Sequence, residues 1–355
     1  MKRKIFFVMT ALKDGGSERV FWLLCQGFNK ALYDVNLVLI DSDKTAFSRD
    51  LPGVNIVDLN TKKASRSFFS LYKLFKKEKP FAVFSTTDHI NILVSFVSLF
   101  VKIPKLIARA SNNPHQMKQY EGFKARFWSL FTRFSYRRYQ VIVCQTREMK
   151  NSVLSEYHLD PGRLVIIPNP VLYTSVLKEL KVSYKIAECK KILVIARMSK
   201  EKGLERLLDV FSELPGTYTL NIAGDGPLKR VLQEKIKKLK LSKRVRLLGS
   251  ITDVIHILPQ YDCVVLSSYT EGFPNVILES LSAGIPVVSF RVGGVNGLLK
   301  DGFNGYIVEQ NDLNAFKERI ITTCNQVWDF AAIKADVFSK YALDKVVPEY
   351  ECLLE

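Results

Sequence analysis

The sequence predicts an α/β protein with two doubly wound parallel sheets, each in a domain of its own. Short β-branched segments alternate with longer amphipathic segments, and this alternation pauses near residue 170 before it resumes. Apolar runs bounded by helices are typical of parallel strands that are buried on both faces. The length of 355 residues also favours two domains, because a single domain commonly holds about 150 residues.

In the first half of the chain, strands and helices are expected in the alternating order of βαβ units. Strands are predicted at 4–9, 35–40, 54–59, 81–85, 105–109, 140–145 and 163–168. Amphipathic segments between them predict helices at 17–31, 66–78, 90–101 and 121–137. The first strand, KIFFVM, illustrates the pattern, since it is a short apolar run that is soon followed by a glycine turn.

The segment 168–191 breaks this rhythm, because it contains two prolines and no clean strand. We interpret it as the linker between an N-terminal, acceptor-side domain at 1–170 and a C-terminal domain at 171–336. Strands resume at 191–196, 218–224, 244–249, 262–267 and 285–290. The final segment, 337–355, is expected to form a helix that packs back on the first domain.

The composition is ordinary for a globular protein, but its charge is uneven. The net charge of +17 is concentrated in residues 1–150, which hold 26 Lys and Arg against 11 Asp and Glu. Such an excess favours an anionic partner for the first half. The six cysteines include no CxxC pair and are interpreted as reduced core residues, and the four histidines show no metal-binding spacing.

No segment of the sequence predicts a transmembrane helix. MKRKIFFVMTAL resembles a signal peptide in its basic start and apolar run, but no small-residue cleavage site follows it. The most apolar segment, 90–101, has 12 residues, whereas a helix that spans a bilayer needs about 20. A cytoplasmic location is expected from the cysteines, which are interpreted as reduced.

The segment EGFPNVILESLSAG carries the strongest sign of a ligand site. Pro274 suits the first position of a helix, and the N–H groups of Asn275 and Val276 then lie at its positive end, where phosphate binds. Glu271 and Glu279 are suited to accept hydrogen bonds from hydroxyl groups on either side of that phosphate, which predicts a nucleotide sugar. Both acids can also be explained without a ligand. Glu271 would be an acid near a helix start that the helix dipole stabilises, and Glu279 would be an ordinary surface residue.

Two cations follow the first strand of the C-terminal domain, in ARMSKEKGLERLL. Arg197 stands at the strand end, and Lys202 precedes Gly203 at the start of a helix. Fixed cations beside a helix start neutralise a diphosphate without a metal ion. Solvated surface charge is the alternative interpretation of the same residues.

Glycine turns follow two further strands. Gly224 and Gly226 precede Pro227 in AGDGPL, and Gly15 and Gly16 precede the first helix. Glycines allow tight turns and a close approach of the backbone to a ligand, although the second pair lacks the G-x-G-x-x-G spacing. Ligand-free turns are the alternative at both positions.

Together these motifs resemble the retaining glycosyltransferases of family 4. The resemblance rests on GGSER, IPNPV, ARMSKEKG, AGDGPL, LLGSITDV and EGFPNVILESLSAGIPVV, and it covers nearly the whole chain. The E-x7-E pattern is specific, whereas the glycine turns are not. The resemblance implies the GT-B fold, in which two facing Rossmann-like domains form an interdomain cleft, and it points to bacterial enzymes that build lipid-linked glycans.

The resemblance also implies a role for each motif residue. Glu279 holds the ribose hydroxyls and Glu271 those of the transferred sugar, while Arg197 and Lys202 hold the diphosphate. Further donor contacts are implied for the backbone around Phe273, Asn275 and Val276, and for the turns at Gly15, Gly16, Gly224 and Gly249, with residues 249–254 flanking the base. We take Arg197, Lys202 and Glu271 as the catalytic residues.

The sequence departs from the family pattern after the fifth strand. Many members carry a histidine there, close to the transferred sugar, whereas this chain reads LIARASNNPHQ. The role of that histidine is not assigned, and Arg109, Asn112, His115 and His89 are retained as contacts with the acceptor or the donor sugar. A structural role is the alternative for each histidine. The turn VGGVNG also lacks the acid that often follows this glycine pair.

The implied reaction moves a sugar from a nucleotide sugar, UDP-sugar being favoured over GDP-sugar, to a lipid-linked saccharide or another cell-envelope glycan. Negative charge develops on the leaving phosphate, where cations and helix N–H groups stabilise it, so neither a metal ion nor another cofactor is expected. A nucleotide-sugar epimerase or phosphorylase is the alternative enzyme. A basic nucleic-acid-binding protein is the alternative of another class, and the nearly neutral second half argues against it.

The Phe123–Tyr139 helix predicts contact with an anionic membrane surface. Basic residues line both edges of its apolar stripe, which consists of Phe123, Phe127, Leu130, Phe131 and Phe134. Helices of this kind lie in the membrane interface, and 62–79 is a second basic, aromatic segment. The alternative is that both helices pack their aromatic faces on the sheet. Membrane contact implies a peripheral location on the inner face of the plasma membrane.

Overall fold

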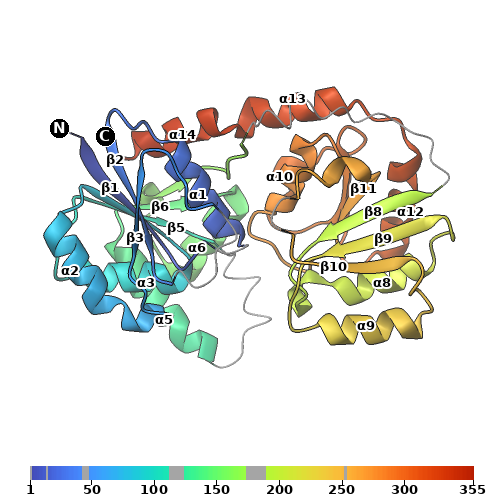
Figure 1. The fold of residues 1–355 in the computed structure, drawn as a ribbon, viewed down its shortest axis with the longest axis horizontal. Helices are drawn as coiled ribbons and strands as arrows, with labels where there is room; N and C mark the ends of the chain where they lie inside the picture. Colours follow the sequence, from blue (N-terminus) through green and yellow to red (C-terminus); the bar gives the residue numbers. More distant parts are fainter. Residues whose placement is uncertain (1, 13–14, 42–47, 112–123, 173–188, 252–253) are drawn as a thin grey trace. The chain divides into compact units, whose positions relative to one another are not determined.

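Two compact units make up the chain. The computed structural model describes residues 2–12, 15–41, 48–111, 124–172, 189–251 and 254–355, and for residues 124–129 the backbone alone. The first unit contains Met1–Leu172 and Tyr341–Glu355, and the second contains Tyr173–Lys340. Each unit is an α/β fold around one parallel sheet, which confirms the predicted fold class (Figure 1).

The sheet of the first unit has the strand order β3-β2-β1-β4-β5-β6-β7. The strands are β1 (Arg3–Met9), β2 (Tyr33–Leu39), β3 (Val54–Asp58), β4 (Ala82–Thr86), β5 (Lys105–Arg109), β6 (Val141–Cys144) and β7 (Leu164–Ile166). In the central strand, Val8 lies opposite Val38 on one side and Ser85 on the other. Consecutive residues from Ile5 to Met9 are buried, so both faces of this part of the sheet are covered.

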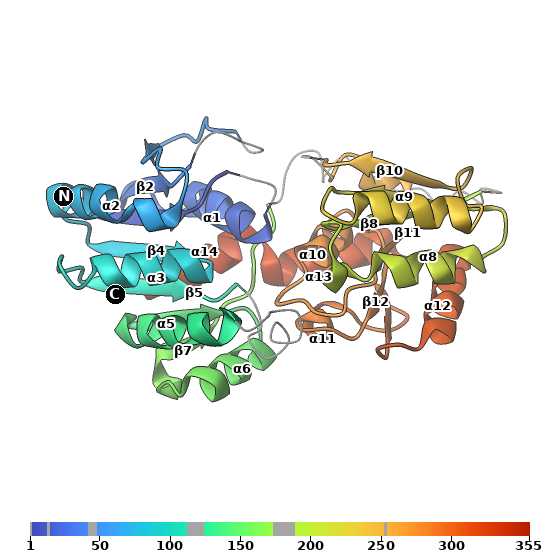
Figure 2. The same cartoon turned by 90° about the horizontal axis from the view of Figure 1, so that it is seen from below.

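Helices cover both faces of this sheet. They are α1 (Gly16–Gly27), α2 (Phe68–Glu78), α3 (Asp88–Val97), α5 (Lys124–Arg138), α6 (Arg147–Tyr157) and α14 (Leu343–Cys352), with single turns of 3-10 helix at Ala64–Arg66 and Pro161–Arg163. Helices α2, α3 and α5 lie side by side on one face (Figure 2). Helices α1 and α14 pack together on the other face.

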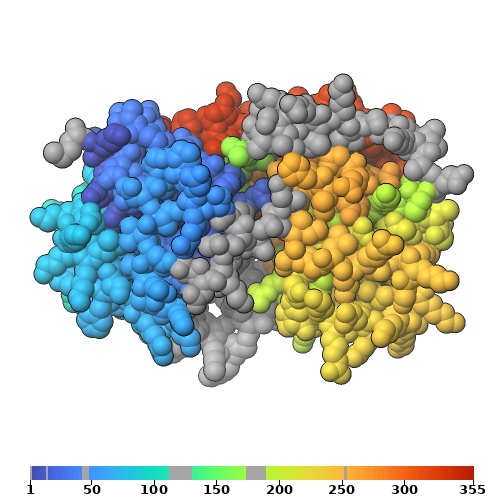
Figure 3. Space-filling model, viewed as in Figure 1, coloured from blue at the N-terminus to red at the C-terminus, as the bar shows by residue number. Residues whose placement is uncertain are grey.

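The C-terminal helix α14 joins the first unit through close contacts with its N-terminal elements. A Cβ added at Gly27 of α1 would lie 2.5 Å from Val347 and 3.0 Å from Leu343, so only glycine fits there. Arg3 donates from Nη1 to the carbonyl oxygen of Leu354 at 3.2 Å. Figure 3 shows the red C-terminal residues beside the blue N-terminal residues.

The sheet of the second unit has the order β10-β9-β8-β11-β12-β13. Its strands are β8 (Lys190–Ile195), β9 (Tyr218–Ala223), β10 (Val245–Gly249), β11 (Cys263–Leu266), β12 (Val287–Phe290) and β13 (Gly305–Val308). Its helices are α8 (Leu204–Ser212), α9 (Lys229–Lys238), α10 (Asn275–Ser282), α11 (Val295–Leu298), α12 (Leu313–Asn325) and α13 (Phe330–Tyr341), with 3-10 turns at Lys200–Lys202 and Leu258–Gln260. Strand β13 was not predicted, because GYIV is only four residues long and follows a turn-rich segment.

The junction between the units differs in part from the expectation. Of the predicted linker 168–191, residues 173–188 lie outside the described residues. Before them, the carbonyl of Val171 accepts the N–H of Leu343 at 3.0 Å. The single helix expected at 337–355 is two helices, α13 and α14, and α13 belongs to the second unit up to Lys340.

Burial of the cysteines and the character of the helices bear on two expectations drawn from composition. Four of the six free cysteines are buried, as predicted for core residues: Cys25, Cys144, Cys263 and Cys324. Cys189 and Cys352 are exposed, so the core interpretation was wrong for these two. Among the helices of the described ranges, none combines the length and the apolar character needed to cross a membrane.

Both sheets change the direction of their strand order at one position. This switch point lies between β1 and β4 in the first unit and between β8 and β11 in the second. Connections from the two neighbouring strands leave toward opposite faces, which opens a crevice at the carboxyl ends of the strands. The loops at these ends are therefore the first candidates for a site in each unit.

Candidate active site

The loops after β8 and β11 meet at the switch point of the second unit. Lys202 ends a turn of 3-10 helix after β8, and Glu271 lies in the loop after β11. The Nζ of Lys202 donates to Oε1 of Glu271 at 2.8 Å, and the two side chains are 22% and 13% exposed. The fold therefore brings together a cation and an acid that the sequence analysis selected separately.

Glu271 is positioned by a second donor and by the loop after β12. Ser268 donates from Oγ to the same carboxylate oxygen at 2.6 Å. A Cβ added at Gly293 would lie 2.4 Å from the carbonyl oxygen of Glu271, so the glycine lets the two loops pack directly together. The sequence analysis did not select Ser268, because no sequence pattern indicates which residue a loop serine will contact.

A buried arginine, Arg206 of α8, holds the loop that carries Glu271. Its Nη2 donates to the carbonyls of Ser267 and Ser268 at 2.6 and 2.7 Å, and its Nε donates to Ser267 at 2.9 Å. The guanidinium carbon lies 3.7 Å from the ring centre of Tyr269 and 4.0 Å from that of Phe290. Sequence reasoning missed Arg206 as well, because an arginine in an amphipathic helix usually faces water.

Helix α10 begins directly after this loop. Pro274 is the residue before the helix rather than its first residue, which corrects the expectation. The helix opens with Asn275 and Val276, and the first N–H groups of any helix have no acceptor within it. Together with Phe273, these residues are half-buried. Their N–H groups lie at the positive end of the helix, which stabilises an anion.

Glu279 lies on α10 and is buried, with 8% of the residue exposed. The surface position that was its alternative interpretation is therefore wrong. Burial of a carboxylate is costly unless other groups stabilise it, so its position calls for polar partners. Across the described ranges, no three His, Cys, Asp or Glu side chains gather as metal ligands would.

The glycine turn after β9 packs against the turn after β8 that contains Arg197. Arg197 itself is exposed. A Cβ added at Gly224 would lie 2.0 Å from the carbonyl oxygen of Ala196, and one at Gly226 would lie 2.6 Å from that of Met198. The close packing of the two turns therefore explains glycine at both positions without a ligand.

The turn after β10 borders the same edge of the sheet. Gly249 has a φ of 74°, a left-handed conformation that favours glycine. Its carbonyl accepts the N–H of Gly224 at 2.7 Å, and a Cβ there would meet no atom within 4 Å. Of the residues expected to flank the base, Val254 is buried, whereas 252–253 lie outside the described residues.

The first unit has a polar pair at its own switch point. Thr10 follows β1, His89 lies in the first turn of α3, and Thr10 Oγ1 is 2.8 Å from His89 Nε2. His89 is exposed, but partial desolvation of its ring lowers its pKa, which favours the neutral form. Gly16 begins α1 and Gly15 precedes it, so both glycines lie at the same edge as His89. Thr10 was not selected from the sequence.

Arg109 is buried at the end of β5, with 3% of the residue exposed. Its Nη2 donates to Oδ1 of Asn169 at 2.5 Å, and its Nη1 donates to Oγ1 of Thr86 at 3.3 Å. Burial lowers the pKa of this guanidinium. These contacts suit a residue that holds neighbouring segments together better than one that touches a ligand. Asn112 and His115 lie outside the described residues.

Two family models match the chain, one in each half. The model described as glycosyltransferase family 4 matches residues 14–172. The model described as glycosyl transferases group 1 matches residues 178–342. The first match ends at residue 172, immediately before the second unit begins, and the second match starts at residue 178.

Similar proteins match over most of the chain. The lipopolysaccharide core biosynthesis glycosyltransferase LpsE of Rhizobium meliloti is 30% identical over 324 residues, 87% of this chain and 85% of the relative. The UDP-Gal:alpha-D-GlcNAc-diphosphoundecaprenol alpha-1,3-galactosyltransferase of Escherichia coli is 26% identical over 298 residues, 80% of this chain and 75% of the relative. The solved structure of Anabaena Alr3699/HepE in complex with UDP and glucose has the same fold, with a TM-score of 0.79 at 16% identity and 99% of both chains covered. This chain is therefore a glycosyltransferase of family 4, with the GT-B fold class that its motifs implied.

Proposed function

We propose that this glycosyltransferase moves a sugar from a UDP-sugar to a lipid-linked saccharide with retention of the anomeric configuration. The observation that carries the proposal is the 2.8 Å contact between Lys202 and Glu271 beside the start of α10. It sets a cation suited to phosphate next to an acid suited to a sugar hydroxyl, at a helix end that favours an anion. In a sugar joined to a diphosphate, the phosphate likewise lies next to the sugar hydroxyls.

The donor is proposed to bind along the carboxyl edge of β8, β10 and β11. Arg197 and Lys202 neutralise the diphosphate together with the first N–H groups of α10. Glu271 accepts hydrogen bonds from the transferred sugar, and Glu279 accepts them from the ribose. Lys202 would lie between the phosphate and Glu271. It would stabilise the charge of the leaving phosphate and also pair with the carboxylate of Glu271.

The proposed chemistry needs no nucleophile from the protein. The bond between the anomeric carbon and a phosphate oxygen of UDP breaks, and its electron pair leaves with the phosphate. Lys202 and the N–H groups of α10 stabilise that charge while the sugar becomes oxocarbenium-like. The acceptor hydroxyl attacks from the face that the phosphate leaves, and its proton passes to a phosphate oxygen. The products are UDP and a glycan extended with the same anomeric configuration.

The names of similar proteins support this choice of donor and acceptor. The E. coli relative is named for UDP-Gal and for a diphosphoundecaprenol-linked sugar, and the R. meliloti relative for lipopolysaccharide core biosynthesis. The HepE structure was solved with UDP and glucose. UDP is therefore proposed in preference to GDP, with a lipid-linked or lipopolysaccharide glycan as the acceptor.

A nucleotide panel tests the donor site. At about 100 times its dissociation constant, UDP is expected to stabilise the protein by about 2.7 kcal/mol. Glu279→Ala is expected to lose most of this stabilisation, because it removes the acceptor proposed for the ribose hydroxyls. The measurement is the thermal shift with UDP, GDP and the corresponding sugars.

Glu318→Ala is the matched control, since Glu318 is an exposed glutamate on helix α12 of the same unit. This control should keep the full shift with UDP. Equal shifts in Glu279→Ala and Glu318→Ala would contradict the ribose assignment. A larger shift with GDP than with UDP would contradict the proposed nucleotide.

An exposed apolar surface on the first unit supports a membrane-bound acceptor. We define the aromatic patch as Phe69, Leu99, Phe100, Leu130 and Phe134, all exposed on α2, α5 and the segment after α3. Phe69 and Phe100 are 72% and 66% exposed. The ring of Phe68 joins them, with centroids 5.4 Å from Phe69 and 5.8 Å from Phe100. Exposed apolar surface of this kind marks an interaction site.

The aromatic patch covers only part of the stripe expected on the Phe123–Tyr139 helix. Leu130 and Phe134 are exposed, whereas Phe131 is half-buried, with its ring centroid 6.4 Å from that of Phe96 on α3. Tyr136 on another side of α5 is buried in the core, which agrees with packing on the sheet there. Phe123 lies outside the described residues, and the side chain of Phe127 does too. Exposed basic residues adjoin the patch in sequence: Arg66, Lys73, Lys102, Arg137 and Arg138.

Contact of the aromatic patch with an anionic leaflet is proposed as the way the enzyme reaches its acceptor. Apolar rings enter the interface while basic side chains meet anionic headgroups. With this contact we propose a peripheral location of the enzyme at the inner face of the plasma membrane. The proposal needs only the first unit to touch the lipid.

Removing two rings tests this contact. Phe69→Ser/Phe100→Ser is expected to weaken binding to phosphatidylglycerol vesicles at least about tenfold, because each buried ring contributes about 1.5–3 kcal/mol. Co-sedimentation with the vesicles gives the measurement. Val327→Ser removes an equally exposed apolar side chain, at 71%, from the second unit and should change nothing. Unchanged binding of the double variant would rule out the patch.

A further inference from the structure

One face of the second sheet is polar where a covered parallel sheet would be apolar. On β9, Leu220 and Ile222 are buried in the core with α8 and α9, whereas Thr219 and Asn221 are only half-buried on the opposite face. On β10, Arg246 is exposed on that face, in register with Asn221. Parallel strands are normally covered on both faces, so the expectation of two-sided burial fails here.

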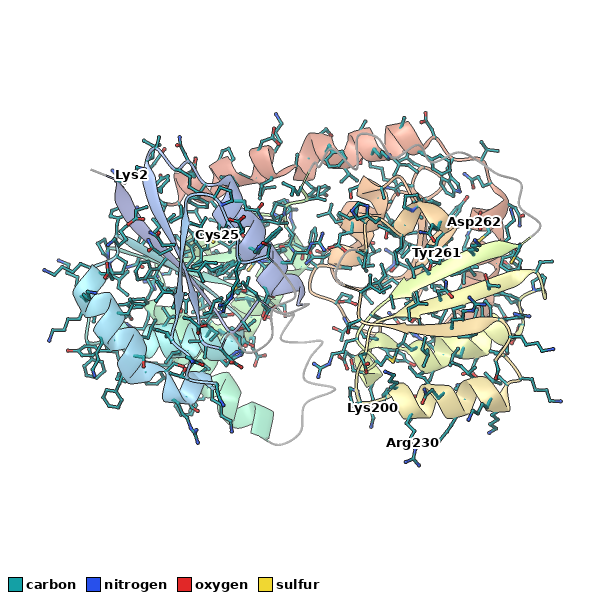
Figure 4. The ribbon with its side chains drawn as sticks, in the orientation of Figure 1. Lys2, Cys25, Lys200, Arg230, Tyr261 and Asp262 are labelled. Atoms are coloured by element: carbon teal, nitrogen blue, oxygen red, sulfur yellow. The ribbon has the colours of Figure 1, made fainter. Side chains whose placement is uncertain are left out.

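A groove of about 340 Å³ lies over this polar face. Its lining residues come from the starts of three neighbouring strands and from the segment before β11: Cys189, Lys191, Thr219, Asn221, Lys243, Arg244, Arg246, Gln260 and Tyr261. Tyr261 is buried, and its hydroxyl accepts from Nδ2 of Asn221 at 2.8 Å. Figure 4 shows Tyr261 and Asp262 on the side of β8 away from α8 and α9.

The lining of the groove carries four positive charges, and one acid adjoins it, Asp262, whose carboxylate accepts the N–H of Lys191 at 2.7 Å. No ion pair involves Lys191, Lys243, Arg244 or Arg246 among the described residues, and the guanidinium of Arg244 instead donates to backbone carbonyls. Elsewhere on the unit, cations commonly pair with acids, as in Lys235–Asp209 and Lys317–Glu213. Four cations around one concave surface create a positive potential that an anion relieves.

From this charge and shape we infer that the groove is a second ligand site, which binds a phosphate-bearing anion. Arg and Lys side chains are the usual partners of phosphate, Arg as a planar fork and Lys as a point charge. The polar face supplies Thr219 and Asn221 as further hydrogen-bonding groups. The volume is at the lower end of small-molecule sites, which suits a small phosphate ligand or a single lipid headgroup.

The groove is separate from the donor site proposed above. Lys191 and Thr219 are the second residues of β8 and β9, whereas Arg197 and Gly224 follow the ends of the same strands. A six-residue strand spans roughly 20 Å, so the two sites lie at opposite ends of the sheet. Occupancy of the groove is thus expected to be independent of the residues that bind the donor.

Cys189 offers a local readout, because it lines the groove and is exposed. Substituting the other exposed cysteine, Cys352→Ser, leaves Cys189 as the exposed thiol, because the remaining four cysteines are buried. Sodium pyrophosphate is expected to slow its reaction with a small uncharged disulfide reagent in a saturable way. Sodium chloride at equal ionic strength is the control for general screening. A second experiment measures the same reaction of Cys189 with anionic phosphatidylglycerol vesicles and, as the control, with phosphatidylcholine vesicles.

Charge reversal in the groove decides the result. Lys191→Glu/Arg246→Glu is expected to weaken the protection of Cys189 by pyrophosphate at least about tenfold, a loss of about 1.4 kcal/mol. Lys243→Glu is a single substitution that should also raise the pyrophosphate concentration needed to protect Cys189. Lys202→Ala changes the donor site alone and should leave the protection unchanged.

The two probes separate the sources of the phosphate. Protection by pyrophosphate supports a soluble ligand, and protection by anionic vesicles alone supports a lipid headgroup in the same groove. Either result must be lost on charge reversal. Failure of both probes, or equal protection in the charge-reversed variant, overturns the inference.

Discussion

Lys202→Ala is expected to lower the turnover of sugar transfer by about 100-fold, because it removes a charge that stabilises the leaving phosphate. The same change takes away the 2.8 Å partner of Glu271, whose side chain is only 13% exposed. Ser268 remains as a donor to that carboxylate, so the loop should keep its position. Release of UDP in the presence of a lipid-linked acceptor measures the turnover.

The control for this variant is Lys317→Ala. Lys317 also forms a close ion pair, with Glu213 at 2.6 Å, but it lies on α12, away from the switch point. Its removal should leave turnover near that of the unchanged protein. If Lys202→Ala matched the control in turnover, the assignment of Lys202 to the leaving group would be wrong.

Arg206→Leu is expected to lower the free energy of unfolding by about 3 kcal/mol, because it removes three hydrogen bonds from a buried guanidinium to backbone carbonyls. Arg206 is 7% exposed, and the carbonyl of Ser267 accepts from both its Nε and its Nη2. The carbonyl of Ser268 accepts from its Nη2 and also from Nε2 of Gln310 at 3.2 Å. Leucine also cannot replace the guanidinium that lies between the rings of Tyr269 and Phe290. Urea unfolding, followed by circular dichroism, gives the free energy.

Arg230→Leu serves as the comparison for this stability test. Arg230 has a similar charge, but its side chain is 89% exposed and pairs with Glu234 within one helix. A change within about 0.5 kcal/mol is expected there. Stability of Arg206→Leu equal to that of Arg230→Leu would show that the loop after β11 does not need the arginine.

The positions of the strands along the chain were largely predictable, because buried parallel strands leave a local signal of short apolar runs. Runs such as KLIAR at 105–109 and KILVIA at 191–196 are short and apolar, and a turn or helix follows each. The observed strands β5 and β8 begin and end within one residue of these ranges. Strand β13 left too weak a signal, since it has four residues and a glycine start.

The candidate site was predictable only where its residues occur in motifs. Lys202 and Glu271 were selected because each stands beside a helix start, and the fold then placed them 2.8 Å apart. Ser268 and Arg206 act through contacts between segments distant in sequence, and no local spacing marks them. The same holds for the groove, which depends on three strands lying side by side.

The return of α14 to the first unit affects how the protein is made on the ribosome. Tyr350 and Leu354 are fully buried in the core of the first unit, and the ring of Tyr350 packs 6.2 Å from that of Phe84. Domains generally fold as units during translation, the N-terminal one first. Here residues 341–355 emerge only after the entire second unit. A nascent chain stalled before Tyr341 would carry a nearly complete second unit and a first unit whose α1 face is still open to water, a surface for chaperones to protect.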